Sequence, residues 1–266
     1  MKHINNQIQK FFMELIQAII LGLLQGFTEW LPISSSGHLV IAQKLMGLTI
    51  PIGFYAMLHV GTLLGVFIFF WRDIRNILKS LIHHDTKGQY FKIFENVLIG
   101  IIPTAVIAVI FLKFFESLFY DLKAVGIGFL ITGGLLLLSK LRNGNKGLNK
   151  LSSLLIGIAQ GASIAPGISR SGSTISVGLL SGLKKEDIFR YSFLLSVPVM
   201  IGWCVLEYKG LMIPDLSIYS AIGMILSAIS GYFAIRVVKK MLLSEKFHLF
   251  AVYCFILGIA VLFYLI

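Results

Sequence analysis

Apolar residues run along the chain in long stretches. Six of these are apolar enough over the length that a helix needs to cross a bilayer, which is about 20 residues. Two further segments, 15–48 and 151–183, are apolar at both ends but interrupted in the middle by Pro, Gly and a cluster of hydroxyl residues. The pattern predicts an all-α polytopic membrane protein with six transmembrane helices, roughly at residues 55–71, 96–115, 124–141, 189–207, 217–238 and 248–266.

The two interrupted segments are copies of each other. Residues 22–48 align without a gap with residues 157–183, 135 positions later, and share ten of 27 residues. We expect each copy to form a re-entrant helix–loop–helix, because a broken helix that crossed the bilayer would expose backbone polar groups to lipid.

Three spans separate the two copies. Because this number is odd, the second half is expected to be inverted relative to the first, as in many membrane folds built from repeats. A weaker echo, Ile99-Gly100 with Ile222-Gly223, supports the same duplication. We therefore predict one membrane domain over 1–266, with repeat one at about 15–141 and repeat two at about 151–266.

Composition agrees with this class and sets the orientation. Hydrophobic residues make up 57% of the chain and charged residues 13%, about half the charged share of a soluble domain. The net charge of +11 indicates cytoplasmic loops and contact with anionic lipid, and no aromatic-interleaved basic tract favours nucleic acid. With two re-entrant segments, the basic stretches 72–95, 140–150, 184–190 and 236–246 all fall on the cytoplasmic side of the plasma membrane, and both termini lie outside.

Glu29 is the strongest candidate for chemistry. An ionisable residue at membrane depth is costly, so it marks a functional site or a buried ion pair, here with Arg170 as the expected partner. Gln25 precedes it by one helical turn and shares its face, where an amide ligates a cation or positions water. The copy of Gln25, Gln160, is expected to form a hydrogen bond between helices.

The hydroxyl clusters predict an anion site. Glycine lets the backbone approach a ligand, and the amides that open the following helix present a positive dipole end. Arg170 adds a fork suited to phosphate oxygens. A packing motif for close helix contact explains the glycines equally well but leaves Arg170 unexplained. The candidate phosphate-binding residues are Ser34, Ser36 and Gly37 in the first copy, and Ser169, Ser171, Gly172 and Thr174 in the second.

Two histidines and a cation complete the candidate set. His38 follows the first hydroxyl turn and is either a catalytic acid–base or a hydrogen-bonded core residue. His59 lies in the next span, where a polar contact within the bundle is the favoured interpretation. No His/Cys metal motif is present, but Glu29 and Gln25 with phosphate oxygens would suit Mg²⁺ or Ca²⁺.

These residues closely resemble the undecaprenyl-diphosphate phosphatase family, the bacitracin-resistance membrane proteins. Residues 25–39, QGFTEWLPISSSGHL, are similar to that family's glutamate-rich motif with its serine turn. Residues 166–174, PGISRSGST, are similar to its second motif, and the likeness covers essentially the whole chain. The resemblance implies hydrolysis of undecaprenyl (polyprenyl) diphosphate to the monophosphate and phosphate, which recycles the lipid carrier for cell-wall polymers such as peptidoglycan. It also implies a site open toward the outer face and activation by a divalent cation.

The resemblance further assigns roles by position. Glu29 matches the essential second glutamate, Ser35 the serine proposed as nucleophile, His38 the nearby histidine and Arg170 the essential arginine. Many members have glutamate where this chain has Gln25. Glu29 would then act alone, or with Gln25 as a neutral ligand.

Several alternatives stay open from the sequence. The attacking oxygen is either that of Ser35 or that of water, and the sequence decides neither the isoprenoid length nor the oligomeric state. The main rival function is a secondary transporter or translocase for a polyprenyl phosphate or another anion, because inverted repeats with broken helices are typical of transporters.

Overall fold

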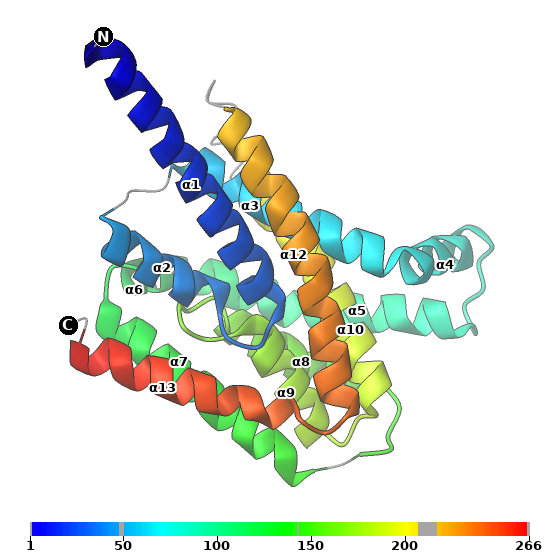
Figure 1. Cartoon of the computed structure of the whole chain (residues 1–266). Helices are drawn as coiled ribbons and strands as arrows, with labels where there is room; N and C mark the ends of the chain where they lie inside the picture. The colour runs from blue at the N-terminus through cyan, green and yellow to red at the C-terminus, as the bar shows by residue number, and fades with distance from the viewer. Residues whose placement is uncertain (1, 48–50, 143, 207–216, 265–266) are drawn as a thin grey trace.

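The computed structural model describes residues 2–47, 51–142, 144–206 and 217–264, and these ranges are almost entirely helical (Figure 1). The predicted connection 208–216 and the two chain ends lie outside the described residues. The helices are α1 Lys2–Trp30, α2 Ser35–Met46, α3 Ile52–Phe69, α4 Trp71–Ile82, α5 Gln89–Ile110, α6 Leu112–Leu118, α7 Leu122–Leu138, α8 Lys150–Ala162, α9 Arg170–Leu180, α10 Lys185–Leu206, α12 Ile218–Leu243 and α13 Phe250–Tyr264.

The predicted all-α membrane protein is confirmed. Among the described residues, five helices are long and apolar enough to cross a membrane: α5, α7 with the turn after it, α10, α12, and α13 with the turn before it. A sixth span is obtained if α3 and α4, which are bent by 75° at the break between them, count as one. One predicted boundary was wrong, because the helix expected over 96–115 ends at Ile110 and a separate short helix, α6, follows the bend at Phe111.

The two duplicated segments fold in the same way. α1 ends at Trp30, a break follows and α2 begins at Ser35, while α8 ends at Ala162, a longer break follows and α9 begins at Arg170. Each break contains a proline, which has no N–H for a helix hydrogen bond and clashes with the preceding turn. α1 begins well before the predicted residue 15, since no Gly or Pro interrupts the sequence before Gly22.

Matching serines start the second helix of each copy. Ser34 caps α2, where its side chain accepts a hydrogen bond from the Gly37 amide at 3.3 Å. Ser169 caps α9 and accepts from the Gly172 amide at 3.1 Å. Serine at this position satisfies one of the amides that a helix N-terminus leaves without a partner. Ser34 has a φ of 65°, in the left-handed region that most residues avoid.

The first helix of each copy packs against a helix of the other half. α1 lies along α12 (Figure 1), and α8 packs on α5. A Cβ on Gly22 would lie 2.7 Å from the carbonyl oxygen of Gly223, and a Cβ on Gly157 would collide with that of Gly100. Glycine is therefore required at both crossings, and the four glycines are the ones that correspond in the duplicated sequence.

Polar contacts join the four basic stretches. Lys150 pairs with Glu95 at 2.8 Å, Arg190 with Asp73 at 3.1 Å and Lys185 with Glu245 at 2.6 Å. In addition, the backbone of Lys146 bonds to both Gly182 and Lys184, in a short parallel bridge. The segment that contains α4 and the start of α5 therefore meets the connections before α8, α10 and α13 at one end of the molecule.

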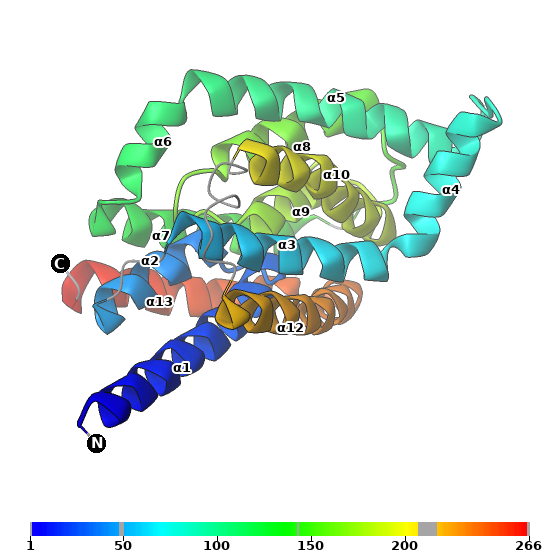
Figure 2. The same cartoon turned by 90° about the horizontal axis from the view of Figure 1, so that it is seen from above.

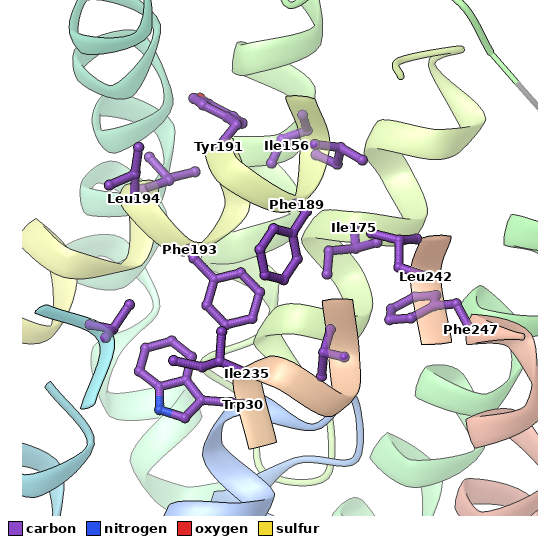
Figure 3. Close-up of a cluster of buried hydrophobic side chains, with 14 of the residues drawn as sticks. Trp30, Ile156, Ile175, Phe189, Tyr191, Phe193, Leu194, Ile235, Leu242 and Phe247 are labelled. Atoms are coloured by element: carbon purple, nitrogen blue, oxygen red, sulfur yellow. The ribbon is translucent and has the colours of Figure 1, made fainter. Parts of the chain in front are cut away.

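An aromatic core lies beside the breaks. Trp30, at the end of α1, is fully buried and stacks on Phe193 of α10 with ring centroids 5.2 Å apart. Phe193 in turn packs on Phe189 at 4.8 Å, and Ile235 of α12 belongs to the same cluster (Figure 3). This core fixes the end of α1 against α10 and α12.

Candidate active site

Glu29, in the last turn of α1, accepts hydrogen bonds from three side chains. Ser35 at the start of α2 donates its hydroxyl to Oε2 at 2.6 Å, and Gln25 donates its amide to the same oxygen at 3.1 Å. Arg170 donates Nη2 to Oε1 at 2.6 Å, across 141 positions of sequence. The predicted pair of Glu29 with Arg170 and the shared face of Gln25 and Glu29 are both confirmed.

The Arg170 guanidinium is held on one edge and one face. Nη2 is bound to the Glu29 carboxylate, and the ring of Trp30 lies 4.6 Å below the guanidinium carbon. Such stacking is a property of arginine that lysine does not share. Within the described part of the chain, the other terminal nitrogen, Nη1, is buried and has no hydrogen-bond partner. A buried N–H without a partner is costly, so Nη1 is the donor best placed for a ligand.

Two helix N-termini converge on this ion pair. Ser35 is the first residue of α2 and Arg170 the first residue of α9, so Glu29 joins the two N-termini. The first amides of a helix have no carbonyl partner within it and carry a partial positive charge. The hydroxyls in each turn also contact one another, Ser34 with Ser36 at 3.2 Å and Ser169 with Ser171 at 3.4 Å. The arrangement is chemically suited to an anion.

The remaining residues of the second turn are buried and support it. Thr174 contacts the Ser192 hydroxyl at 2.6 Å and donates to the Arg170 carbonyl at 2.8 Å. The Ser169 amide donates to Thr132 of α7 at 2.9 Å. Gly37 and Gly172 are the third residues of α2 and α9, and their amides donate to the capping serines. Thr174 therefore links the first turn of α9 to Ser192 of α10.

His38 and His59 make different kinds of contact. Both ring nitrogens of His38 are engaged, Nδ1 with the Ser34 carbonyl at 2.7 Å and Nε2 with the Tyr253 hydroxyl at 2.6 Å, and its ring stacks on Tyr253. Of the two interpretations for His38, these contacts favour the hydrogen-bonded core residue. His59 of α3 instead places Nε2 4.0 Å from Glu29 Oε2, while its Nδ1 bonds to the Tyr55 carbonyl at 3.0 Å.

Two residues that the sequence did not assign to the site, His59 and Trp30, contact Glu29 and Arg170 respectively. The signal for His59 was an ionisable side chain in an otherwise apolar helix, the same argument that selected Glu29. For Gln160 the expectation was right, since its amide contacts Thr104 of α5 at 3.5 Å.

A cation site is limited by the side chains present. Among the described residues, no three His, Cys, Asp or Glu side chains come together to hold a metal ion. The carbonyl oxygen of Gln25 is nevertheless buried without a hydrogen-bond partner, next to the Glu29 carboxylate that its amide group contacts. Oxygen donors of this kind fit a hard cation such as Mg²⁺, which often takes few protein ligands and completes its shell with oxygens of the substrate.

Comparison with known proteins identifies similar sequences over nearly the full length. The family profile described as bacitracin resistance protein BacA matches residues 18–260. A protein of Korarchaeum cryptofilum named undecaprenyl-diphosphatase is 43% identical over 261 residues, which cover 94% of this chain and 99% of that protein. Proteins with the same name from Halothermothrix orenii and Methanosphaera stadtmanae are 45% and 38% identical, over 94% and 93% of this chain and 98% and 96% of theirs.

Proposed function

The chain belongs to the bacitracin resistance protein BacA family, and from this premise we propose that it hydrolyses undecaprenyl diphosphate, or a similar polyprenyl diphosphate, to the monophosphate and phosphate. The observation that carries the proposal is the Arg170 guanidinium, which is fixed by Glu29 and Trp30 and whose Nη1 is buried without a hydrogen-bond partner among the described residues. The polyprenyl tail remains in the lipid, against the apolar surface of the bundle. The product is a lipid carrier that returns to the synthesis of cell-wall polymers.

Binding of the diphosphate group uses the residues of both turns. Arg170 Nη1 and the first amides of α2 and α9 donate to phosphate oxygens, and the hydroxyls of Ser34, Ser36, Ser169 and Ser171 complete the set. Phosphoryl transfer depends mostly on positioning and on the stabilisation of charge, for which such donors are well suited.

Glu29 acts as the general base. Its Oε2 lies 2.6 Å from the Ser35 hydroxyl, the geometry of an activated nucleophile with its base. The Ser35 oxygen attacks the terminal phosphorus, its proton passes to Glu29 and the bond to the lipid monophosphate breaks. Water then attacks the phosphoserine and releases phosphate. His38 takes no part in this scheme, because Ser34 and Tyr253 occupy its ring nitrogens.

A divalent cation, Mg²⁺ or Ca²⁺, would be held by Gln25 Oε1 and the Glu29 carboxylate, with phosphate oxygens of the substrate as further ligands. When bound, it supplies positive charge that offsets the negative charge of the diphosphate. Gln25 contributes a neutral ligand here, whereas a second carboxylate would add charge.

We expect purified protein in detergent to release inorganic phosphate from polyprenyl diphosphate, and to do so more slowly after treatment with a chelator. Phosphate release measured by colorimetry, with and without chelator and with Mg²⁺ or Ca²⁺ added back, checks both points. The Ser35→Ala variant is a further arm, in which we expect a loss of about 10²-fold or more if serine is the nucleophile.

The rival function gives a different result in the same assay. A transporter or translocase binds the diphosphate without releasing phosphate, and moves it between leaflets in vesicles. Unchanged activity in chelator would argue against the cation but not against the phosphatase. Phosphorylated Ser35 trapped by rapid acid quench, and detected by mass spectrometry, separates attack by serine from attack by water.

We also propose that α1–α2 and α8–α9 are re-entrant, that the two halves form an inverted repeat, and that the basic stretches lie in the cytoplasm with both termini outside. The bridge between Lys146 and Leu183 supports the re-entrant form of α8–α9, because the chain enters α8 and leaves α9 at the same end of the molecule. The matched glycine crossings, α1 on α12 and α8 on α5, support the inversion. The ion pairs that join the four basic stretches support a common side.

Cysteine accessibility tests this topology. In a background with Cys204 and Cys254 replaced by alanine, we expect Thr86→Cys and Asn145→Cys to react with an impermeant thiol reagent only after the cell membrane is opened. Lys123→Cys, at the exposed start of α7, is the matched control and should react from outside. Labelling of residues 86 and 145 from opposite faces would overturn the arrangement.

A further inference from the structure

α4 leaves the bundle at a sharp angle. It follows α3 after a single break at Phe70, the two helix axes differ by 75°, and α4 connects the ends of α3 and α5 at the edge of the molecule (Figure 2). α3 and α4 qualify as a span only together, and all the Asp, Glu, Lys and Arg residues of the pair lie in α4. α3 is therefore the part that enters the membrane, and a helix bent from it by that angle runs close to the plane of the membrane surface. The basic stretch that contains α4 marks this surface as the one that the other basic stretches share.

One face of α4 packs against the rest of the protein. Ile74 and Ile77 pack against the main hydrophobic core, and Ser80 is buried. Asp73 turns to α10, where it pairs with Arg190 at 3.1 Å. This face binds the helix to the rest of the protein and uses the helix's one acidic side chain.

The opposite face is apolar, basic and uncovered. Trp71, Leu78 and Ile82 are 58%, 53% and 74% exposed, and their spacing of seven and four residues places them on one side of the helix. Arg72, Arg75 and Lys79 are exposed beside this row. No packing within the described residues explains why three large apolar side chains stand out here among cations.

We propose that this face of α4 is a binding surface for anionic phospholipid in the cytoplasmic leaflet. Trp71, Leu78 and Ile82 enter the boundary between headgroups and acyl chains, while Arg72, Arg75 and Lys79 contact headgroup phosphates. An amphipathic helix that lies in the membrane plane, with Trp and Leu on one face and Lys and Arg at its border, binds lipid in this way. Lipid is favoured over a protein partner because the face is continuous with the membrane-embedded surface through α3, and because its charge is only positive.

Two measurements on full-length protein in vesicles test the proposal. The first is quenching of tryptophan fluorescence by phosphatidylcholine brominated near the headgroup end of its acyl chains. The chain has three tryptophans, so the difference between the wild-type protein and the Trp71→Phe variant isolates Trp71. We expect strong quenching of this component, and an unquenched Trp71 would overturn the proposal and indicate that a protein partner or the chain itself covers the face.

The second measurement is native mass spectrometry of the lipid retained from an equal mixture of phosphatidylglycerol and phosphatidylcholine. We expect the variant Arg72→Gln/Arg75→Gln/Lys79→Gln to lose preference for phosphatidylglycerol by about fivefold or more, the effect of one or more charges at such a surface. Lys113→Gln/Lys123→Gln, on exposed lysines at the ends of α6 and α7 away from α4, is the matched control and should keep the preference. Equal preference in the triple variant and the wild type would overturn the proposal, and retained phosphatase activity in detergent shows that the variant is folded.

Discussion

Replacing Arg170 by alanine is expected to lower the rate of phosphate release by about 10³-fold or more, the range measured when an arginine that stabilises a transferring phosphoryl group is removed. The reason is the fork geometry of the side chain. Nη2 donates a hydrogen bond to Glu29, and Nη1 is available to donate to phosphate. The alanine variant loses the contact with phosphate. It also leaves the buried Glu29 carboxylate without the positive charge of the guanidinium.

Arg170→Lys distinguishes these two effects. An ammonium group keeps the charge beside Glu29 but has no second nitrogen in a fixed plane and stacks less well on Trp30. We expect it to restore the stability of the folded protein but not its activity, with a loss of about 10²-fold against wild type. Arg190→Lys, at the ion pair with Asp73 at 3.1 Å, is the matched control and should leave turnover unchanged. Near-normal turnover in Arg170→Lys would refute the role given to Nη1.

Replacing Glu29 by glutamine is expected to cost about 10²–10⁴-fold in turnover, the usual contribution of a general base. The amide keeps the size of the side chain and an oxygen for Ser35 or Arg170, but it cannot accept the serine proton. The change also leaves the Arg170 guanidinium buried next to a neutral group, so a fall in thermal stability is expected alongside the loss of activity.

The measurement for Glu29→Gln is single-turnover phosphate release, combined with thermal unfolding in detergent. Glu245→Gln, which removes the exposed pair with Lys185, is the matched control and should change neither quantity strongly. If Glu29→Gln unfolds at the wild-type temperature and keeps its turnover, the carboxylate is neither the general base nor an essential ion-pair partner of Arg170. The proposed mechanism would then be refuted.

Much of the local structure followed from the sequence. The lengths of the apolar stretches predicted the spans because a helix satisfies its backbone groups internally and lipid offers no other partner. Proline, glycine and the hydroxyl cluster predicted that each copy is broken in the middle, because their effects on the backbone act over only a few residues. Gln25 on the face of Glu29 followed from the helical period alone.

Residue pairs far apart in sequence were harder to predict. Arg170 was a plausible partner for Glu29 only because each was the unusual charge of its copy. His38 was selected for its nearness to Glu29 along the chain, but the turn at Ser34 directs its ring to Tyr253 of α13. His59, 30 positions from Glu29, comes within 4.0 Å of it because α3 packs beside α1.

The sequence by itself determined the class of the protein, the two broken helices and the residue types gathered in each break, since all three depend on short-range patterns of hydrophobicity, capping and charge. The tertiary structure alone decided which of these residues meet. Contact between Glu29, Arg170 and His59 depends on how α1, α3 and α9 cross, and glycine contacts and aromatic packing set these crossings over long distances in sequence. The uncovered face of α4 was also decided by the tertiary structure, because the 75° bend and the packing of Ile74 and Ile77 on the core determine which side of the helix stays exposed.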